Sequence, residues 1–141
     1  MRVAIIITTF NWPESLSLVL QSIEIQSRIP DEIIIADDGS DKETEILVSA
    51  FMKNSKLNII HSWQINKGFR AAQSRNRAIA KSKADYIILI DGDMVLHKNF
   101  VHDHCSSAEK NTFIQGCRVL LTSELTQKKL MIKNIFFSFF S

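Results

Sequence analysis

Short, mostly apolar runs alternate with amphipathic stretches over the first two thirds of the chain. Four such runs cover residues 3–7, 33–36, 57–61 and 86–90, and all are rich in isoleucine. Runs of this length with β-branched residues are typical of strands that are buried on both faces of a sheet. The pattern therefore predicts four buried strands.

Helical periodicity fills the gaps between these runs. Pro13 suits the first turn of a helix, and apolar residues follow it at helical spacing. Ser40 and Glu43 have the spacing of a capping box, which predicts the start of a second helix. The predicted apolar positions are Leu16, Val19, Leu20 and Ile23 in the first helix, and Ile46, Leu47, Ala50 and Phe51 in the second.

The second half of the chain continues the alternation. We expect helices over about 70–81 and 100–109, and a further strand within 113–121. Strands that alternate with helices predict an α/β fold with a doubly wound, mainly parallel sheet and right-handed crossovers. Ligands of such sheets bind beyond the carboxyl ends of the strands.

The composition is that of one globular domain. The chain has 141 residues, of which 45% are hydrophobic and 23% are charged. The net charge of +2 indicates no particular partner, and we expect no nucleic acid. Cys105 and Cys117 lack CxxC spacing and are expected to be small buried residues in a reducing compartment. No secretory signal or apolar run of about twenty residues is recognisable, so we expect a cytoplasmic location.

Polar clusters follow three of the four predicted strands. They are Thr8, Thr9, Phe10 and Asn11 after the first strand, Asp37, Asp38, Gly39 and Ser40 after the second, and Asp91, Gly92 and Asp93 after the fourth. Because the carboxyl ends of parallel strands meet at one edge of a sheet, we expect the clusters to form one site.

The third of these clusters is an acidic pair. Asp91 and Asp93 are two residues apart, so in an extended chain they project to the same side. Gly92 permits a tight turn and the close approach of a ligand. Two carboxylates suit Mg²⁺ or Mn²⁺, which retain open positions for water and phosphate oxygens. The alternative is a polar turn that only ends the strand.

The Asp37–Asp38 pair also has two interpretations. Acids at this position of an α/β sheet can accept hydrogen bonds from a ribose hydroxyl or a base N–H. The sequence Asp-Asp-Gly-Ser is equally suited to an Asx turn with no ligand. Trp12 and Trp63 are similarly open, since each could pack in the core or border a pocket.

A basic stretch follows the third predicted strand. Gly68 precedes the helix expected over 70–81, and Lys67 and Arg70 lie beside the partial positive charge of its N-terminus. This position suits a diphosphate, whose charge the cations and a metal would share. The chain has neither GxGxxG nor GxxxxGK[ST], which disfavours dinucleotide and P-loop chemistry.

Together these residues resemble the family 2 glycosyltransferases, which have the GT-A fold. The shared motifs are Thr8-Thr9-Phe10-Asn11, Ala36-Asp37-Asp38-Gly39-Ser40, Asn66-Lys67-Gly68-Phe69-Arg70, Ser74-Arg75-Asn76-Arg77-Ala78-Ile79 and Asp91-Gly92-Asp93. Their order and spacing match across nearly the whole chain. Residues 63–76, 90–94 and 116–121 look like the bacterial chondroitin-polymerase-like branch, whose relatives build capsule and lipopolysaccharide sugars.

The resemblance implies a donor site for a nucleotide-diphosphate sugar, with UDP-sugar expected. Asp38, helped by Asp37, would contact the uracil or ribose, and Arg75 and Asn76 would lie beside the donor. Asp91 and Asp93 would form a DxD motif for Mn²⁺ or Mg²⁺, in which Asp93 is favoured over Asp91 as the direct ligand. The implied donor-binding residues are Thr8, Thr9, Phe10, Asn11, Asp37, Asp38, Lys67, Gly68, Arg70, Arg75, Asn76, Asp91 and Gly92, and the implied metal ligands are Asp91 and Asp93.

The resemblance also implies partners and a location. A saccharide or lipid-linked saccharide would be the acceptor, and the transfer would invert the anomeric carbon. The product would be cell-surface polysaccharide or lipopolysaccharide. The protein would be cytoplasmic, either free or peripheral on the inner face of the cytoplasmic membrane.

One part of the family pattern is missing. The family's general base is usually the Asp of a Glu-Asp pair well downstream of DxD, and no Glu-Asp pair follows Asp93. We therefore expect residues 1–125 to form the nucleotide-sugar-binding part of the domain. Residues 126–141 would be an apolar tail from a truncated continuation, and no catalytic base would be present.

The residues are also compatible with other function classes. The nearest is a non-catalytic module that binds nucleotide sugars without turnover. A sugar nucleotidyltransferase would need a Gly-rich and basic loop after the first strand, and residues 8–13 offer none. A phosphoacceptor domain would need a Lys at a later strand end, which is also missing.

Overall fold

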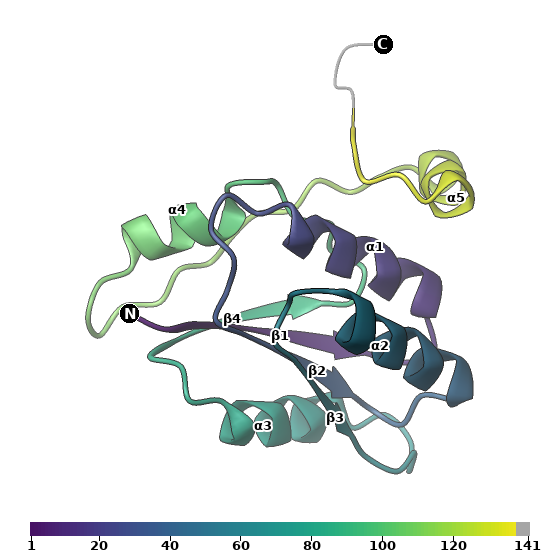
Figure 1. The fold of residues 1–141 in the computed structure, drawn as a ribbon, viewed down its shortest axis with the longest axis horizontal. Coiled ribbons are helices and arrows are strands. Elements are labelled where there is room, and N and C mark those ends of the chain that lie inside the picture. The colour runs from purple at the N-terminus through teal and green to yellow at the C-terminus, as the bar shows by residue number, and fades with distance from the viewer. Residues whose placement is uncertain (138–141) are drawn as a thin grey trace.

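The protein, described over residues 1–137 by a computed structural model, has one parallel sheet between layers of helices (Figure 1). The strands are β1 Val3–Thr9, β2 Glu32–Asp37, β3 Ile59–Trp63 and β4 Tyr86–Asp91. They lie in the order β3-β2-β1-β4, and every neighbouring pair is parallel. The predicted α/β architecture is confirmed, although β3 lies two residues later than expected.

Helices cover both faces of the sheet. They are α1 Pro13–Glu24, α2 Lys42–Asn54, α3 Ala71–Lys81, α4 Phe100–Ser107 and α5 Ser123–Ile132. Figure 1 shows α1, α2 and α4 on one side of the sheet and α3 on the other. This double covering explains why the central strands are apolar at almost every position.

The core lies on both sides of β1 and β2. Alternate residues of a strand face opposite sides. Ile5 therefore packs with Leu16 of α1 in one apolar cluster, while Ile6 packs with Ala78 of α3 in the other. All four predicted apolar positions of α1 are fully buried, which confirms the helical periodicity.

The strand register brings the polar clusters together. Thr8 of β1 lies beside Asp91 of β4, and Thr9 of β1 lies beside Asp37 of β2. Residues that are far apart in sequence therefore meet at the carboxyl edge of the sheet.

The start and the buried face of α2 differ from the prediction. Asp41 is its N-cap, and no side chain caps the helix. The predicted capping box is not formed: Ser40 precedes the N-cap, and its hydroxyl accepts a hydrogen bond from the Asn11 N–H (2.9 Å). Val48 is buried together with Thr44, whereas the predicted core residue Ile46 is 60% exposed. Ala50 is exposed as well.

The strand predicted within 113–121 is absent from the described part of the chain. This segment has no regular secondary structure, and Phe113 is 89% exposed. A strand needs a neighbour for its backbone hydrogen bonds, and no strand pairs with this segment. Cys117 lies in it and is exposed, contrary to the expected burial, and Cys105 is half-buried.

Helix α5 was not predicted from the sequence. The Thr122 side chain caps it by accepting a hydrogen bond from the Leu125 N–H (3.2 Å). The boundary expected after residue 125 falls inside this helix, and the last four residues of the expected tail lie outside the described residues. Over residues 1–137, no helix combines the length and apolarity that a membrane span requires.

Candidate functional site

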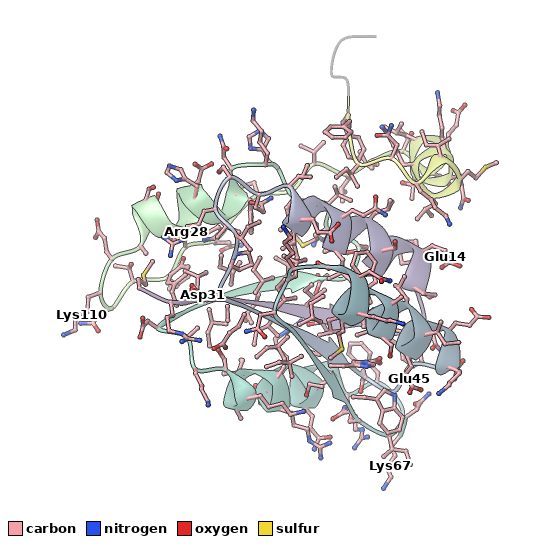
Figure 2. The ribbon with its side chains drawn as sticks, viewed as in Figure 1. Glu14, Arg28, Asp31, Glu45, Lys67 and Lys110 are labelled. Atoms are coloured by element: carbon pink, nitrogen blue, oxygen red, sulfur yellow. The ribbon has the colours of Figure 1, made fainter. Side chains whose placement is uncertain are left out.

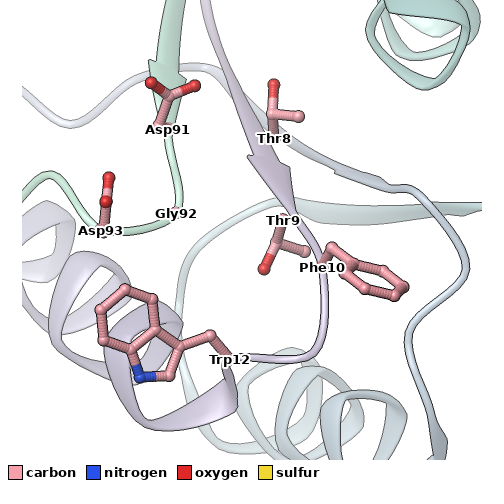
Figure 3. Close-up of a pocket in the computed structure, with 7 residues that line it drawn as sticks. All are labelled: Thr8, Thr9, Phe10, Trp12, Asp91, Gly92 and Asp93. Carbon is pink, nitrogen blue, oxygen red and sulfur yellow. The ribbon is translucent and has the colours of Figure 1, made fainter. Parts of the chain in front are cut away.

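A pocket of about 200 Å³ opens at the carboxyl ends of β1 and β4. It is lined by Thr8, Thr9, Phe10, Trp12, Asp91, Gly92 and Asp93. Figure 3 shows the loop after β1 on one side of the pocket and the acidic turn after β4 on the other. Two of the three predicted clusters therefore form its walls.

Gly92 allows the acidic turn to pack against β1. Its N–H donates to the Thr8 carbonyl oxygen (2.8 Å), which extends the pairing of β4 with β1. A Cβ at this position would lie 3.0 Å from the Thr8 carbonyl oxygen and 3.2 Å from the Thr9 Oγ1. Only glycine fits without displacing the Thr8–Thr9 backbone and side chains.

The two acids of this turn present oxygen ligands to the pocket. Figure 3 shows the carboxyl groups of Asp91 and Asp93 projecting to the same side of the turn. Both residues are exposed, and in residues 1–137 they belong to no cluster of three or more metal-ligating side chains. Two carboxylates with room for water and ligand oxygens fit Mg²⁺ or Mn²⁺ better than metals that prefer nitrogen or sulfur.

Arg75 of α3 reaches the same strand ends. Its Nη2 lies 3.6 Å from the Asp91 Oδ1, and its Nε–H donates to the Thr8 Oγ1 (3.2 Å). The side chains of Arg75 and Asp91 are 34% and 51% exposed. The guanidinium therefore bridges β1 and β4 at the pocket rim.

Asp37 is directed into the protein. It is fully buried, and its Oδ1 accepts from the N–H groups of Gly39 (3.2 Å) and Ser40 (2.8 Å). Its Oδ2 lies 2.8 Å from the His61 Nε2. Burial on its own would raise the pKa of this carboxyl, but hydrogen bonds from His61 and Ser40 outweigh it and lower that pKa.

Asp38 is also bonded to its own chain. It is only 4% exposed, and its Oδ1 accepts from the Gln64 Nε2 (2.6 Å). Its Oδ2 accepts from the backbone N–H of Arg70 (2.6 Å), just before α3. Asp38 thus ties the β3–α3 loop to the end of β2, and its predicted contact with a nucleotide stays a prediction.

The loop after β1 is tied to the turn after β2. Asn11 has a positive φ of 45°, which asparagine tolerates better than most residues. Its side-chain oxygen accepts from the Asp41 N–H (2.7 Å), and its own N–H donates to the Ser40 Oγ. Trp63 adds a bond from its Nε1–H to the Ser40 carbonyl oxygen (3.1 Å). Trp63 therefore supports the turn next to the pocket without lining it.

The remaining predicted donor residues do not line this pocket. Lys67 extends away from the body of the protein in the β3–α3 loop (Figure 2), and Gly68 lies beside it with φ +82°. The Arg70 guanidinium donates to the Gln73 side chain and the Ile65 carbonyl oxygen. Asn76 is exposed on α3.

Sequence reasoning missed two residues of the region, His61 and Gln64, which position Asp37 and Asp38. Trp12, for which core and pocket were both considered, lines the pocket. The sequence signal that could have identified His61 and Gln64 is a polar cluster at the end of β3, the one strand for which no such cluster was noted. It was overlooked because β3 was expected to end at residue 61, whereas Trp63 is its last residue.

A family-level comparison identifies the chain. The sequence profile described as "Glycosyl transferase family 2" matches residues 4–140. The chain belongs to glycosyl transferase family 2.

Curated relatives agree with this family. The hyaluronan synthase of Pasteurella multocida is 35% identical over 102 residues, which is 72% of this chain and 10% of that protein. The chondroitin synthase of Escherichia coli is 32% identical over 138 residues, covering 91% of this chain and 20% of that protein. The chain thus spans a small fraction of the length of these relatives.

Solved structures share the fold. Staphylococcus aureus TarS residues 1–349, in complex with UDP-GlcNAc, has a TM-score of 0.64 and 24% identity over 75% of this chain and 30% of its own. Glucosyl-3-phosphoglycerate synthase from Mycobacterium tuberculosis was solved with Mn²⁺, UDP and glucosyl-3-phosphoglycerate. Its TM-score is 0.57, and its sequence identity is 22% over 77% of this chain and 40% of its own. These likenesses establish the GT-A fold predicted from the sequence.

Proposed function

We propose that this family 2 glycosyltransferase chain binds a UDP-sugar, or another nucleotide-diphosphate sugar, in the pocket at the carboxyl ends of β1 and β4. The observation that carries the proposal is the strand register, which sets Thr8 beside Asp91 and Thr9 beside Asp37. Acids from separate strands thereby share one edge of the sheet. The complexes of TarS with UDP-GlcNAc and of glucosyl-3-phosphoglycerate synthase with Mn²⁺ and UDP support the proposal.

Asp91 and Asp93 would hold the divalent cation, Mn²⁺ or Mg²⁺. When bound, such an ion neutralises charge on the diphosphate. Arg75 has the charge and position to bind a phosphate oxygen at the same rim, because its Nη2 lies 3.6 Å from the Asp91 Oδ1. Lys67 and Arg70 would add positive charge only if the β3–α3 loop closes over the donor.

The nucleoside would lie against the loop after β1. Phe10 and Trp12 are 51% and 42% exposed and offer aromatic surface at the pocket. Asp38, positioned by Gln64, is the proposed recognition group for the uracil or ribose. Asp37 serves it indirectly, by fixing the turn through its bonds to Gly39 and Ser40.

The proposed reaction is transfer of the sugar to a saccharide or lipid-linked saccharide acceptor with inversion, in cell-surface polysaccharide or lipopolysaccharide synthesis. The family resemblance and the hyaluronan and chondroitin synthase relatives support this role. We place the protein in the cytoplasm or on the inner face of the membrane. No residue of this chain is assigned as the general base.

The second candidate is a nucleotide-sugar-binding chain without turnover. The pocket lining favours it, because Asp91 and Asp93, the two acids among the lining residues, are both assigned to the cation. Incubation with UDP-sugars, a saccharide acceptor and Mn²⁺ separates the two functions. Release of UDP that Asp93→Ala abolishes supports transfer, whereas tight UDP binding without release supports the binding module. Absence of both would reject the donor site.

A further inference from the structure

Arg75 is the cationic partner of Asp91 within residues 1–137. The two side chains form the ion pair at 3.6 Å, and the Arg75 Nε–H also donates to the Thr8 Oγ1 (3.2 Å). Two contacts from one guanidinium fix its position better than a single exposed ion pair would. The contact is therefore part of the pocket rim.

The fold directs Arg75 to this position. Helix α3 packs against the sheet through Ser74 and Ala78, which are both buried. Arg75 follows Ser74 at the edge of that buried face, where its side chain can reach the strand ends. Thr8 and Asp91 lie side by side there in the strand register.

This geometry creates competition for Asp91. The Arg75 guanidinium and a divalent cation are both positive, so both would be drawn to the one Asp91 carboxylate. A divalent cation on Asp91 would be repelled by Arg75 at this range. Asp93 has no ion pair in the described part of the chain, so the competition acts through Asp91 alone.

A diphosphate removes the conflict. Its oxygens accept paired hydrogen bonds from a guanidinium, which gives Arg75 an alternative anionic partner. Asp91 is then released for the cation, which the diphosphate also attracts. Each ligand thus favours binding of the other, which is the definition of positive coupling between sites.

We propose that Arg75 is a positioning residue that holds Asp91 until a diphosphate arrives, so that cation and donor bind together and the cation alone binds weakly. This inference rests on the proposed function, because it assumes the cation site at Asp91 and Asp93. It adds an order of binding that the donor site alone does not require.

The test measures Mn²⁺ binding without nucleotide, by water-proton relaxation, and then UDP binding with and without Mn²⁺. Arg75→Gln should bind Mn²⁺ alone about threefold to tenfold more tightly than the parent. The same variant should bind UDP with Mn²⁺ about tenfold more weakly. Arg77→Gln is the matched control, since it removes the same charge from an exposed position of α3 and should change neither affinity.

If Arg75→Gln does not fold, the same two affinities are measured on Arg75→Lys. It keeps the charge, so Mn²⁺ alone should bind about as it does to the parent, but UDP with Mn²⁺ should bind about threefold more weakly. Equal Mn²⁺ affinity in the parent and Arg75→Gln would overturn the inference, as would equal UDP affinity in the parent and Arg75→Lys. If Asp93→Asn also binds Mn²⁺ and UDP like the parent, the proposed function itself fails.

Discussion

The four acids at the carboxyl edge of the sheet differ in what surrounds them. Asp37 and Asp38 are buried and bonded to their own chain, whereas Asp91 and Asp93 are exposed at the pocket. Sequence motifs gave the positions of all four. The motifs could not show which acids are buried, because His61 and Gln64, which bond to Asp37 and Asp38, lie at the end of β3. That strand was predicted to end two residues too early.

Asp38→Asn should lower the stability of the protein. The substitution replaces an acceptor of the Arg70 N–H or of the Gln64 Nε2 with an amide donor, which leaves a buried group unpaired. We expect the free energy of unfolding to fall by about 1–3 kcal/mol in urea titration. Asp41→Asn is the control, since Asp41 is exposed and makes no side-chain cap bond, and its effect should stay within about 0.5 kcal/mol. Equal effects of the two substitutions would contradict this role of Asp38.

Among the secondary-structure elements, the turn after β2 contacts both the loop after β1 and the β3–α3 loop. Gly39 has φ +96°, and a Cβ there would lie 2.5 Å from the backbone nitrogen of Asn66. Residues other than glycine rarely adopt this backbone conformation. The Cβ would also clash with the backbone of Asn66, which cannot shift without moving its loop. The turn can therefore pack against the β3–α3 loop only if residue 39 is glycine.

Gly39→Ala should destabilise the protein by about 2–4 kcal/mol because strain and a backbone clash add. Thermal unfolding should show a lower midpoint, and UDP affinity should fall because Asp38 loses its position. Gly116→Ala provides a control with open space and no positive φ, and it should have little effect. A midpoint for Gly39→Ala that matches the Gly116→Ala midpoint would show that the turn tolerates a side chain.

Helices and strands were predicted correctly where burial sets the spacing of apolar residues. The prediction failed where the structure depends on contacts with other segments. The face of α1 was predicted correctly because its four predicted positions pack with the strands in one core cluster. The face of α2 was predicted only in part, since Leu47 and Phe51 pack against the core but Val48, not Ile46, is buried there. The apolar residues of 113–121 resemble a strand in sequence, but no neighbouring strand pairs with them.

At the scale of the whole molecule, the sequence predicted the sheet and the edge at which the site lies. Buried parallel strands give continuous apolar runs, and these are visible without knowledge of contacts. The arrangement after α4 was not predictable in the same way. Much of that part is exposed, including Val119 at 78% and Leu120 at 79%, so burial periodicity gives no guide to its structure.

Acid should weaken the folded state through Asp37 and Glu32. Burial would raise the pKa of each carboxyl, but hydrogen bonds from His61 and Ser40 to Asp37, and from Lys83, Ser82 and Arg2 to Glu32, lower it. A lowered folded-state pKa gives stability that is complete above the ordinary carboxyl value, about 4, and is lost as pH falls below it. The free energy of unfolding should therefore decrease between about pH 5 and about pH 3.

Asp37→Asn should reduce this pH dependence, because the amide does not titrate. Urea titrations across the same pH range measure the slope, with the exposed Asp41→Asn variant as the matched control. The Asp37→Asn slope should be smaller than that of the parent, and the Asp41→Asn slope should equal the parent's. A parent-like slope in Asp37→Asn would show that Asp37 contributes nothing to acid sensitivity.

We propose that acids from separate strands form one site for a divalent cation and a nucleoside diphosphate. Calorimetric titration of UDP with and without Mn²⁺ checks this in the parent, in Asp93→Ala and in the exposed control Asp103→Ala. We predict that Mn²⁺ strengthens UDP binding about tenfold or more in the parent and in Asp103→Ala, and not in Asp93→Ala. UDP binding that is unaffected by Mn²⁺ in the parent, or a Mn²⁺ effect that persists in Asp93→Ala, would contradict the claim.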